Sequence, residues 1–267
     1  MPELPEVETV RRGLSKAWVG RTIQGVELRR ENLRFPFPPD LDIKLVDRTI
    51  RNIRRRAKYL LIDLDNGSVI LSHLGMSGRW TLDAADSSGK HDHVVFHLDD
   101  DTISVYTDPR RFGVLDLFDG KSHKLLDHLG PEPLDDWTGE CLYHAISGRK
   151  SAIKTLILDQ KIVVGVGNIY ACEALHRVGI DPTRKGCDVS LEECKMLAIQ
   201  IRDTLRDAIA AGGSTLKDFA ATDGALGYFP HQFRVYDKEG EECSCGAIIE
   251  RMVQTGRSTF WCSSCQK

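Results

Sequence analysis

The residue pattern of this chain of 267 residues changes from strand-like to helical at one proline-rich acidic segment, Gly130-Pro-Glu-Pro-Leu-Asp-Asp. Before it, short apolar runs such as Tyr59-Leu-Leu-Ile-Asp-Leu alternate with turn signals, which is typical of a β-sandwich or barrel. After it, residues 136–220 have helical periodicity and end near Gly212-Gly213. The sequence therefore predicts an α+β protein with more than one domain.

The first residues read Met1-Pro-Glu-Leu-Pro-Glu-Val-Glu and lead into a helix that we expect over residues 6–16. Its apolar side chains Val7, Val10 and Leu14 recur on one face.

The second residue has its own chemical meaning. Removal of Met1 would leave Pro2 as a terminal secondary amine, whose pKa near 7.7–8.0 keeps part of it nucleophilic at neutral pH. Such an amine attacks an electrophilic carbon and becomes an iminium, and Glu3 can supply the proton that this step needs. The alternative is an extended lead-in whose Glu6 and Glu8 only cap the helix.

Charge is distributed unevenly. The net charge is −3 and the sequence pI is about 6.3, yet residues 1–60 contain fourteen Lys or Arg against eight Asp or Glu. The densest run, residues 51–58, suits a phosphate-binding face or is a solvated surface. No apolar run approaches the roughly 18 residues that span a bilayer. We expect an intracellular protein without a membrane segment.

Eight cysteines fall into two sets. Four are scattered through residues 141–194 and read as ordinary buried thiols of a reducing compartment. The others, Cys243, Cys245, Cys262 and Cys265, lie within 23 residues, a spacing typical of a tetrahedral zinc site that pins a segment too small for its own core. Arg257 falls near the tip of the hairpin expected between the two pairs.

Three glycine-flanked segments suggest ligand contacts. Asn168 follows Gly165-Val-Gly where a helix begins, which favours either phosphate binding by backbone N–H groups or simple N-capping. Arg110 and Phe112, in a strand connection, suit a wedge that enters a base stack, and Met76 occupies a similar turn. The alternative for Met76 and Phe112 is a place in the core.

Taken together and in this order, these motifs resemble those of bacterial formamidopyrimidine-DNA glycosylases, repair enzymes that remove oxidised purines. The resemblance covers essentially the whole chain. It is carried by Pro2-Glu-Leu-Pro-Glu-Val-Glu, Arg56-Ala-Lys-Tyr-Leu, His73-Leu-Gly-Met-Ser-Gly, Lys90-His-Asp-His, Asp108-Pro-Arg-Arg-Phe-Gly, Gly165-Val-Gly-Asn-Ile-Tyr, Gly213-Ser-Thr-Leu-Lys-Asp-Phe and the closing residues 257–266.

The resemblance implies three parts. Residues 1–130 would form the catalytic helix and β-sandwich, residues 131–222 a helix–two-turn–helix DNA-binding domain, and residues 223–267 a lesion loop and a zinc hairpin. One structural Zn²⁺ would be bound by the four clustered cysteines. This family normally has Cys-x-x-Cys in its first zinc pair, whereas the present pair is Cys-x-Cys. Either both thiols bind through a tighter loop, or one position is replaced.

The resemblance also implies roles for single residues. Pro2 would attack C1′ of a flipped nucleotide, with Glu3 as acid and Glu6 in support. Lys58, Asn168 and Arg257 would grip phosphates, and Lys58 and Arg257 would assist the eliminations. Further contacts with DNA would be made by His91, Arg110 and Lys150. The space that the flipped base leaves in the stack would be filled by Met76, Arg110 and Phe112.

The implied partner is duplex DNA with an oxidised purine opposite cytosine, bound by a monomer in the bacterial cytoplasm near the nucleoid. The loop at residues 222–228 would close over the damaged base. Two alternatives are an endonuclease VIII-like enzyme for oxidised pyrimidines and a catalytically silent damage-binding protein. The first typically begins with Gly where this chain has Leu4, and the second has no need of an intact Pro2, Glu3 and Lys58.

Overall fold

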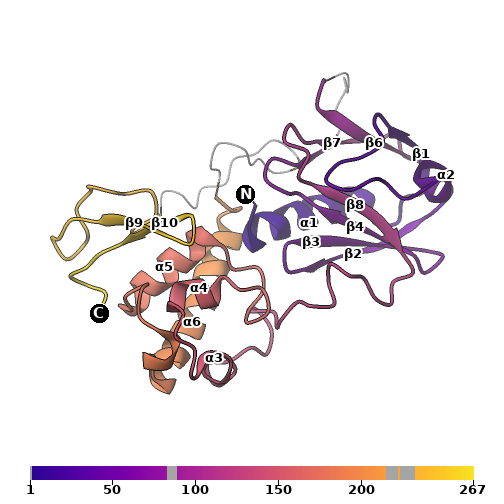
Figure 1. The fold of residues 1–267 in the computed structure, drawn as a ribbon. Helices are drawn as coiled ribbons and strands as arrows, with labels where there is room; N and C mark the ends of the chain where they lie inside the picture. Colours follow the sequence, from indigo (N-terminus) through magenta and orange to yellow (C-terminus); the bar gives the residue numbers. More distant parts are fainter. Residues whose placement is uncertain (1, 83–88, 215–221, 223–231) are drawn as a thin grey trace. The chain divides into compact units, whose positions relative to one another are not determined.

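A computed structural model describes residues 2–82, 89–214, 222 and 232–267 (Figure 1). Met1 and most of the expected lesion loop, residues 223–228, lie outside this range. The chain divides into two compact units, one formed by residues 1–127 and 211–230 and the other by residues 128–210 and 231–267. Among the described residues, no helix combines the length and apolar character that spanning a membrane requires.

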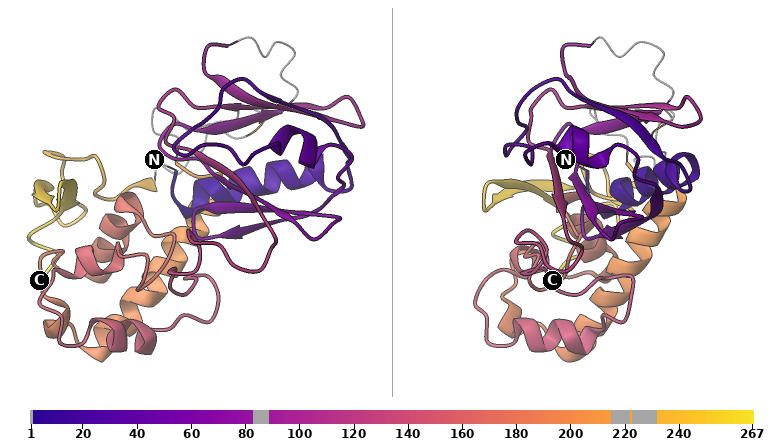
Figure 2. Two further views of the ribbon diagram at one scale, coloured as in Figure 1. Left: turned by 45° about the vertical axis from the view of Figure 1, so that its right-hand side comes forward. Right: turned by 90° about the vertical axis from the view of Figure 1, so that its right-hand side faces the viewer.

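The first unit is a sandwich of two antiparallel four-stranded sheets with a helix packed against strands of both (Figure 2). Helix α1 spans Leu4–Trp18, two residues longer than expected at each end. One sheet has the order β1 (Ile23–Leu28), β6 (Asp92–Leu98), β7 (Ile103–Thr107) and β5 (Arg79–Leu82). The other has the order β2 (Ile50–Arg56), β3 (Tyr59–Leu64), β4 (Val69–His73) and β8 (Val114–Phe118), and the short helix α2 (Leu41–Leu45) contacts β1.

The core of this unit lies between α1 and the sheets. Val7, Val10 and Leu14 are buried in it, as the helical spacing predicts. Trp18 and Trp80 meet edge to face, with ring centroids 5.0 Å apart, and the Trp18 indole N–H donates to the Ser104 hydroxyl at 2.8 Å. Large aromatic burial of this kind contributes on the order of 2–3 kcal/mol per side chain. The position of α1, which begins at Leu4, is therefore fixed by this unit's own core.

The second unit consists of helices and a small terminal hairpin. Its helices are α3 (Gly139–Ile146), α4 (Ile153–Ile157), α5 (Asn168–Val178) and α6 (Leu191–Ala210), and α5 and α6 pack on each other. Strands β9 (Glu250–Gln254) and β10 (Arg257–Trp261) form the hairpin, and β10 contacts α5. The predicted α+β architecture, with an N-terminal helix and sandwich, a helical domain and a C-terminal hairpin, is confirmed.

Candidate active site and zinc centre

The start of α1 fixes two buried carboxyl groups. Glu3 is the N-cap residue, and a reciprocal capping box joins it to Glu6: the Glu3 N–H donates to Glu6 Oε2 at 2.8 Å while the Glu3 side chain accepts from the Glu6 N–H. Glu6 also accepts from the backbone N–H and the hydroxyl of Ser214, at 2.8 and 2.9 Å. Glu3 and Glu6 therefore cap the helix. The same hydrogen bonds hold Glu3, the residue that follows Pro2, in a buried position.

Lys58 lies in the two-residue turn that joins β2 to β3. Ala57, the first turn residue, has φ of 52°, a left-handed conformation that costs a residue with a Cβ about 1–2 kcal/mol. The Arg55 guanidinium donates to the Ala57 carbonyl at 3.0 Å, and only 8 % of Lys58 is exposed. The sheet thus holds this lysine in a defined, partly desolvated place.

His73, at the end of β4, is electrostatically coupled to that lysine. Burial, together with the positive charges of Lys58 and Arg34, lowers the pKa of His73 to about 4. Its ring packs on Tyr59 with centroids 4.7 Å apart, and Nδ1 accepts the Gly75 N–H at 3.0 Å. His73 is therefore a neutral imidazole at neutral pH, with its proton on Nε2.

The loop that contains Arg110 and Phe112 is organised by Asp108, which is fully buried. One carboxylate oxygen of Asp108 accepts the Ser77 hydroxyl at 2.7 Å, and the other accepts the Gly113 N–H at 2.8 Å. The Arg110 N–H in turn donates to the Ser77 hydroxyl oxygen at 3.1 Å. A buried carboxylate with these partners holds the loop in one conformation.

The Met76 turn packs on the same loop by close backbone approach. Gly75 has φ of 62°, and a Cβ there would collide with the Phe112 carbonyl carbon. Phe112 is 45 % exposed, so the core alternative for it is wrong, whereas Met76 is half-buried. The Arg110 guanidinium lies 5.1 Å from the Phe112 ring centroid. The structure thus brings all three expected stack-filling residues to neighbouring turns.

His91 and Lys150 are two further expected DNA contacts. The His91 carbonyl accepts the Asp108 N–H at 3.0 Å, so His91 adjoins the loop of Arg110 within the first unit. Lys150 is exposed just before α4 in the second unit. The structure therefore divides the expected DNA contacts between both units.

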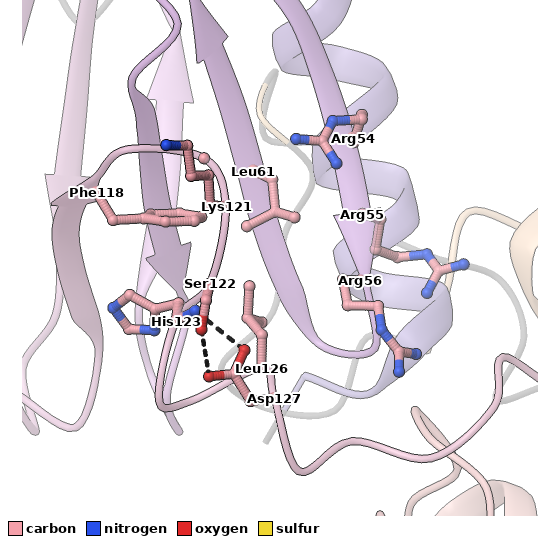
Figure 3. A pocket seen from close by; sticks show the side chains of 11 residues that line it. Arg54, Arg55, Arg56, Leu61, Phe118, Lys121, Ser122, His123, Leu126 and Asp127 are labelled. Atoms are coloured by element: carbon pink, nitrogen blue, oxygen red, sulfur yellow. Dashed lines mark hydrogen bonds between the residues drawn. The ribbon is translucent and has the colours of Figure 1, made fainter.

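Two arginines of the basic run on β2 form ion pairs. Arg54 donates to Asp63 at 2.7 Å and Arg55 to Glu8 at 3.3 Å. Burial alone would raise the pKa of Glu8, but hydrogen bonds from neighbouring arginines and their charges lower it below its usual range. Residues 54–56 form one wall of a pocket of about 290 Å³, and residues 118–127 provide the other (Figure 3). Two of the positive charges of this run are thus paired within the unit.

In the second unit, Asn168 and the terminal hairpin are joined by Lys154, which is 1 % exposed. Its ammonium donates to Asn168 Oδ1 and to the Thr259 hydroxyl, each at 2.7 Å, and to the Ser258 carbonyl at 3.3 Å. The Asn168 amide donates to the same Ser258 carbonyl at 2.9 Å. Gly167, not Asn168, is the N-cap of α5, so the N-cap alternative for Asn168 is wrong.

Arg257 is held at the tip of the same hairpin. It is exposed and pairs with Gln254 across the two-residue turn Thr255-Gly256, in which both residues have positive φ, 48° and 74°. That is the pattern of a type I′ turn, the tightest hairpin connection. Because Ser258 follows directly, the Lys154 network fixes the strand that carries Arg257.

The four clustered cysteines converge despite the short first pair. Cys243 Sγ lies 3.8 Å from Cys265 Sγ, Cys245 Sγ lies 3.6 Å from Cys262 Sγ, and all four sulfurs are within 4.8 Å of one another. Zn–S bonds of about 2.3 Å in a tetrahedron require S···S separations of roughly 3.8 Å. The sulfur positions fit one Zn²⁺, and both thiols of the Cys-x-Cys pair take part.

The tighter loop is made possible by its backbone. Gly246 has φ of 87°, and its N–H donates to the Cys243 carbonyl at 2.8 Å. Burial raises the pKa of Cys262, and a hydrogen bond with Cys245 raises that of Cys265. In contrast, hydrogen bonds from the Ala247 N–H and then from the other three thiols lower the pKa of Cys245 to about 6 and favour its thiolate form. Zinc binding requires that form.

Comparison with known proteins decides the family. Residues 1–115 match the Formamidopyrimidine-DNA glycosylase N-terminal domain, residues 129–220 the Formamidopyrimidine-DNA glycosylase H2TH domain, and residues 244–267 the Zinc finger found in FPG and IleRS. The chain belongs to the formamidopyrimidine-DNA glycosylase family. The family, the enzyme class of DNA glycosylase with abasic-site lyase activity, and the four-cysteine zinc finger predicted from the sequence are confirmed.

Relatives match over their full length. A formamidopyrimidine-DNA glycosylase of Rhizorhabdus wittichii is 51 % identical and one of Ruegeria pomeroyi 48 %, each covering 100 % of both chains. Among solved structures, MutM (Fpg) from Thermus thermophilus has a TM-score of 0.90 at 36 % identity, covering 99 % of this chain and 98 % of that one. A complex of a Lactococcus lactis Fpg mutant with Fapy-dG-containing DNA has a TM-score of 0.92 at 34 % identity, with full coverage of both chains.

Three residues of this glycosylase that the structure singles out, His73, Asp108 and Lys154, had no role assigned from the sequence. His73 and Asp108 occur within the family motifs: His73 precedes the turn that contains Gly75 and Gly78, and Asp108 begins Asp108-Pro-Arg-Arg-Phe-Gly. Lys154 gives a weaker signal, a lysine on the apolar side of a short helical segment. Its function becomes visible only when Ser258 and Thr259 are brought to it.

Proposed function

We propose that the chain excises oxidised purines from duplex DNA and then cleaves the resulting abasic strand by β,δ-elimination, with Pro2 as the nucleophile once Met1 is removed. The observation that carries this proposal is the buried Glu3–Glu6 capping box, which sets Pro2 immediately before a fixed carboxyl group. Family membership supplies the reaction class within which this geometry is interpreted.

The chemistry follows from a secondary amine beside an acid. Pro2 attacks C1′, the damaged base leaves, and protonation of the ring oxygen by Glu3 opens the sugar to an iminium. The iminium acidifies the C2′ hydrogens, so the 3′ phosphate departs by β-elimination and the 5′ phosphate by δ-elimination. Glu6 supports Glu3 through the shared cap rather than by contact with the sugar.

Phosphate binding is assigned to groups of both units. In the first, Lys58 contributes a positive charge and neutral His73 a donor at Nε2. In the second unit, Asn168 and the backbone N–H groups at the start of α5 would bind a phosphate, because a helix N-terminus carries partial positive charge. Arg257 completes this group, and Lys58 and Arg257 also assist the eliminations.

Base extrusion leaves a gap that Met76, Arg110 and Phe112 would fill. The exposure of Phe112 and its contact with the Arg110 guanidinium support this role, because an apolar wedge and a donor can replace the stacking and pairing of the lost base. Arg110 would read the orphaned cytosine, and His91 and Lys150 would contact the flanking strand.

Known complexes guide the choice of DNA. The solved relatives include Lactococcus lactis Fpg bound to Fapy-dG-containing DNA and to DNA with an abasic site. For the present chain we propose the same class of damaged duplex, bound by a monomer in the bacterial cytoplasm. We retain the division into residues 1–130, 131–222 and 223–267 as functional parts, since the matched domains fall within or close to these ranges.

Borohydride trapping tests the proposal. A duplex with 8-oxoguanine opposite cytosine is incubated with the wild type, Pro2→Gly and Pro5→Gly; Pro5 is the matched control because it also lies in the first turn of α1. We expect a covalent adduct with the wild type and Pro5→Gly and a strongly reduced yield with Pro2→Gly. Equal adduct from Pro2→Gly, or intact Met1 in trapped protein, would contradict a Pro2 nucleophile.

The same assay separates the remaining functions. Preferential cleavage of a thymine glycol duplex would indicate an endonuclease VIII-like specificity. Tight binding of both duplexes with no adduct and no cleavage would indicate a damage-binding protein.

A further inference from the structure

His176, near the end of α5, contacts the zinc centre from outside the cysteine loops. Its Nε2 lies 3.4 Å from Cys243 Sγ, within the range of a hydrogen bond to sulfur. The histidine is 8 % exposed and the cysteine 4 %, so little water competes for this contact. Cys172, one helical turn earlier on α5, belongs to the same buried cluster.

The direction of this hydrogen bond follows from the other ring nitrogen. Nδ1 of His176 is buried and has no hydrogen-bond partner among the described residues. A zinc-bound thiolate only accepts, so the proton of the neutral imidazole belongs on Nε2, where it has a partner. We propose that His176 is a positioning residue of the zinc centre, which donates its Nε2–H to the Cys243 thiolate.

The electrostatics of the centre explain why such a donor matters. A zinc ion with four thiolates has a net charge of −2, and burying that charge is unfavourable unless donors surround the sulfurs. Cys245 receives the Ala247 N–H, and Cys262 receives backbone N–H groups of residues 264 and 265. Cys243 is the buried thiol of the first pair, and His176 supplies it with a side-chain donor.

The short first pair makes an external donor useful. In the loop of residues 243–247, the Gly246 N–H is used by the Cys243 carbonyl and the Ala247 N–H by the Cys245 sulfur. With one residue fewer than the family's usual Cys-x-x-Cys, the loop has one backbone donor fewer to offer. A histidine from α5 can take that place.

The contact also ties the metal to the helix that begins with Asn168. Glu173, one turn before His176, accepts the N–H groups of Arg234, Val235 and Tyr236 at 2.9–3.0 Å. The chain entering the zinc segment and the zinc ligand Cys243 are thus both anchored on α5. Zinc, through His176, holds the hairpin against the helix whose other end carries Asn168.

The test compares three variants of the full chain. His176→Phe keeps a ring of similar size but removes the donor, and His176→Gln places an amide N–H close to the position of Nε2. Ile249→Val removes one methylene from the buried cluster that contains Cys243 and changes no polar group, so it controls for packing. Zinc affinity is measured by chelator competition, and each protein is also loaded with Co²⁺ to record the thiolate-to-cobalt charge-transfer band.

We expect His176→Phe to weaken zinc binding by about 10–100-fold, the usual effect of removing a donor behind a metal ligand. Its cobalt band should move to lower energy, because a thiolate without its hydrogen bond donates charge more readily. His176→Gln should restore most of both properties, and Ile249→Val should leave the band in place. Wild-type affinity and band in His176→Phe, or an equal band shift in Ile249→Val, would overturn the assignment, as would failure of His176→Gln to recover either property.

Discussion

The two units hold their functional side chains by different means. In the first, Glu3 and Glu6 are fixed by backbone capping, and Lys58 by a two-residue turn, on elements that share one large apolar core. In the second, Asn168 is fixed by the buried ammonium of Lys154, and the hairpin by four thiols around a metal position. One arrangement depends on apolar burial and the other on charged groups.

This difference has a consequence for robustness. A large core spreads its stabilisation over many side chains, so we expect a single conservative change near the site of the first unit to leave the fold intact. A small hairpin has few apolar contacts, and its stability is concentrated in one ion and one lysine. Substitutions in the second unit should therefore affect structure and activity together, whereas those in the first should separate them.

Loss of zinc gives the largest expected effect. Cys262→Ser removes a ligand that is fully buried, and structural zinc contributes on the order of 10 kcal/mol to the folding of small zinc modules. We expect loss of bound zinc, rapid proteolysis within residues 232–267 and loss of excision activity. Cys194→Ser is the control, because Cys194 is equally buried on α6 but outside the cluster. Protease resistance of zinc-free Cys262→Ser would show that the hairpin does not depend on the ion.

Removal of Lys154 is expected to have the next largest effect. Lys154→Met leaves the Ser258 carbonyl, the Thr259 hydroxyl and Asn168 without their shared donor, which should destabilise the second unit by about 3 kcal/mol. Because Asn168 and Arg257 lose their fixed positions, excision should fall on the order of 100-fold. Lys185→Met removes an exposed charge from the same unit and should change neither value greatly. Equal losses in both variants would point to net charge rather than to the network.

The first unit should respond to pH through His73. Its pKa of about 4 in the folded protein lies below the ordinary 6.5, so between these values the unfolded chain binds more protons. The contribution of His73 to stability is complete above about pH 6.5. It is lost as the pH falls toward 4, by up to about 1.4 kcal/mol for each pH unit. Buried His93 also has a lowered pKa and contributes in the same direction. Only a comparison of a His73 variant with the wild type therefore isolates the contribution of His73.

His73→Asn isolates this term, since the Asn side-chain oxygen can still accept the Gly75 N–H but does not titrate. Urea unfolding at several pH values should give a shallower decline of unfolding free energy below pH 6.5 for this variant. His144→Asn, at an exposed histidine, should follow the wild-type curve. Identical curves for all three proteins would mean that His73 titrates alike in the folded and unfolded chains.

The sequence predicted the elements whose signals are local. The apolar face of Val7, Val10 and Leu14, the strand over residues 59–64 and the clustered cysteines each depend on spacing within a short segment, and each is present. The fold class followed from these signals, because strand-like and helical patterns occupy separate parts of the chain.

The positioning residues could not be predicted in the same way. Lysine is almost never fully buried unless paired, so Lys154 reads as a surface residue until Ser258 and Thr259, more than 100 positions later, supply acceptors. His176 likewise gains its meaning only from Cys243, 67 residues away. Long-range polar contacts leave no periodic pattern in the sequence. The zinc-binding cysteines were therefore predicted from the sequence, whereas Lys154 and His176 were not.

The smallest expected effect concerns the turn that precedes Arg257. Thr255 is exposed with φ of 48°, a conformation that is costly for a β-branched residue. Thr255→Asn creates the favoured Asn-Gly pair and should stabilise the hairpin by about 1 kcal/mol, seen as slower proteolysis of zinc-depleted protein. Gly256→Ala should act in the opposite direction, because Gly256 has φ of 74°.

The excision activity of Thr255→Asn then distinguishes two explanations for the strained backbone conformation of Thr255. If excision is unchanged, the turn only closes the hairpin, and zinc and Lys154 alone fix the strand behind it. If excision falls while the hairpin becomes more stable, the strain belongs to the placement of Arg257, because strained backbone persists where it serves a function. If Thr255→Asn changes neither the stability of the hairpin nor the activity, turn chemistry has no influence once the metal and the lysine network are in place.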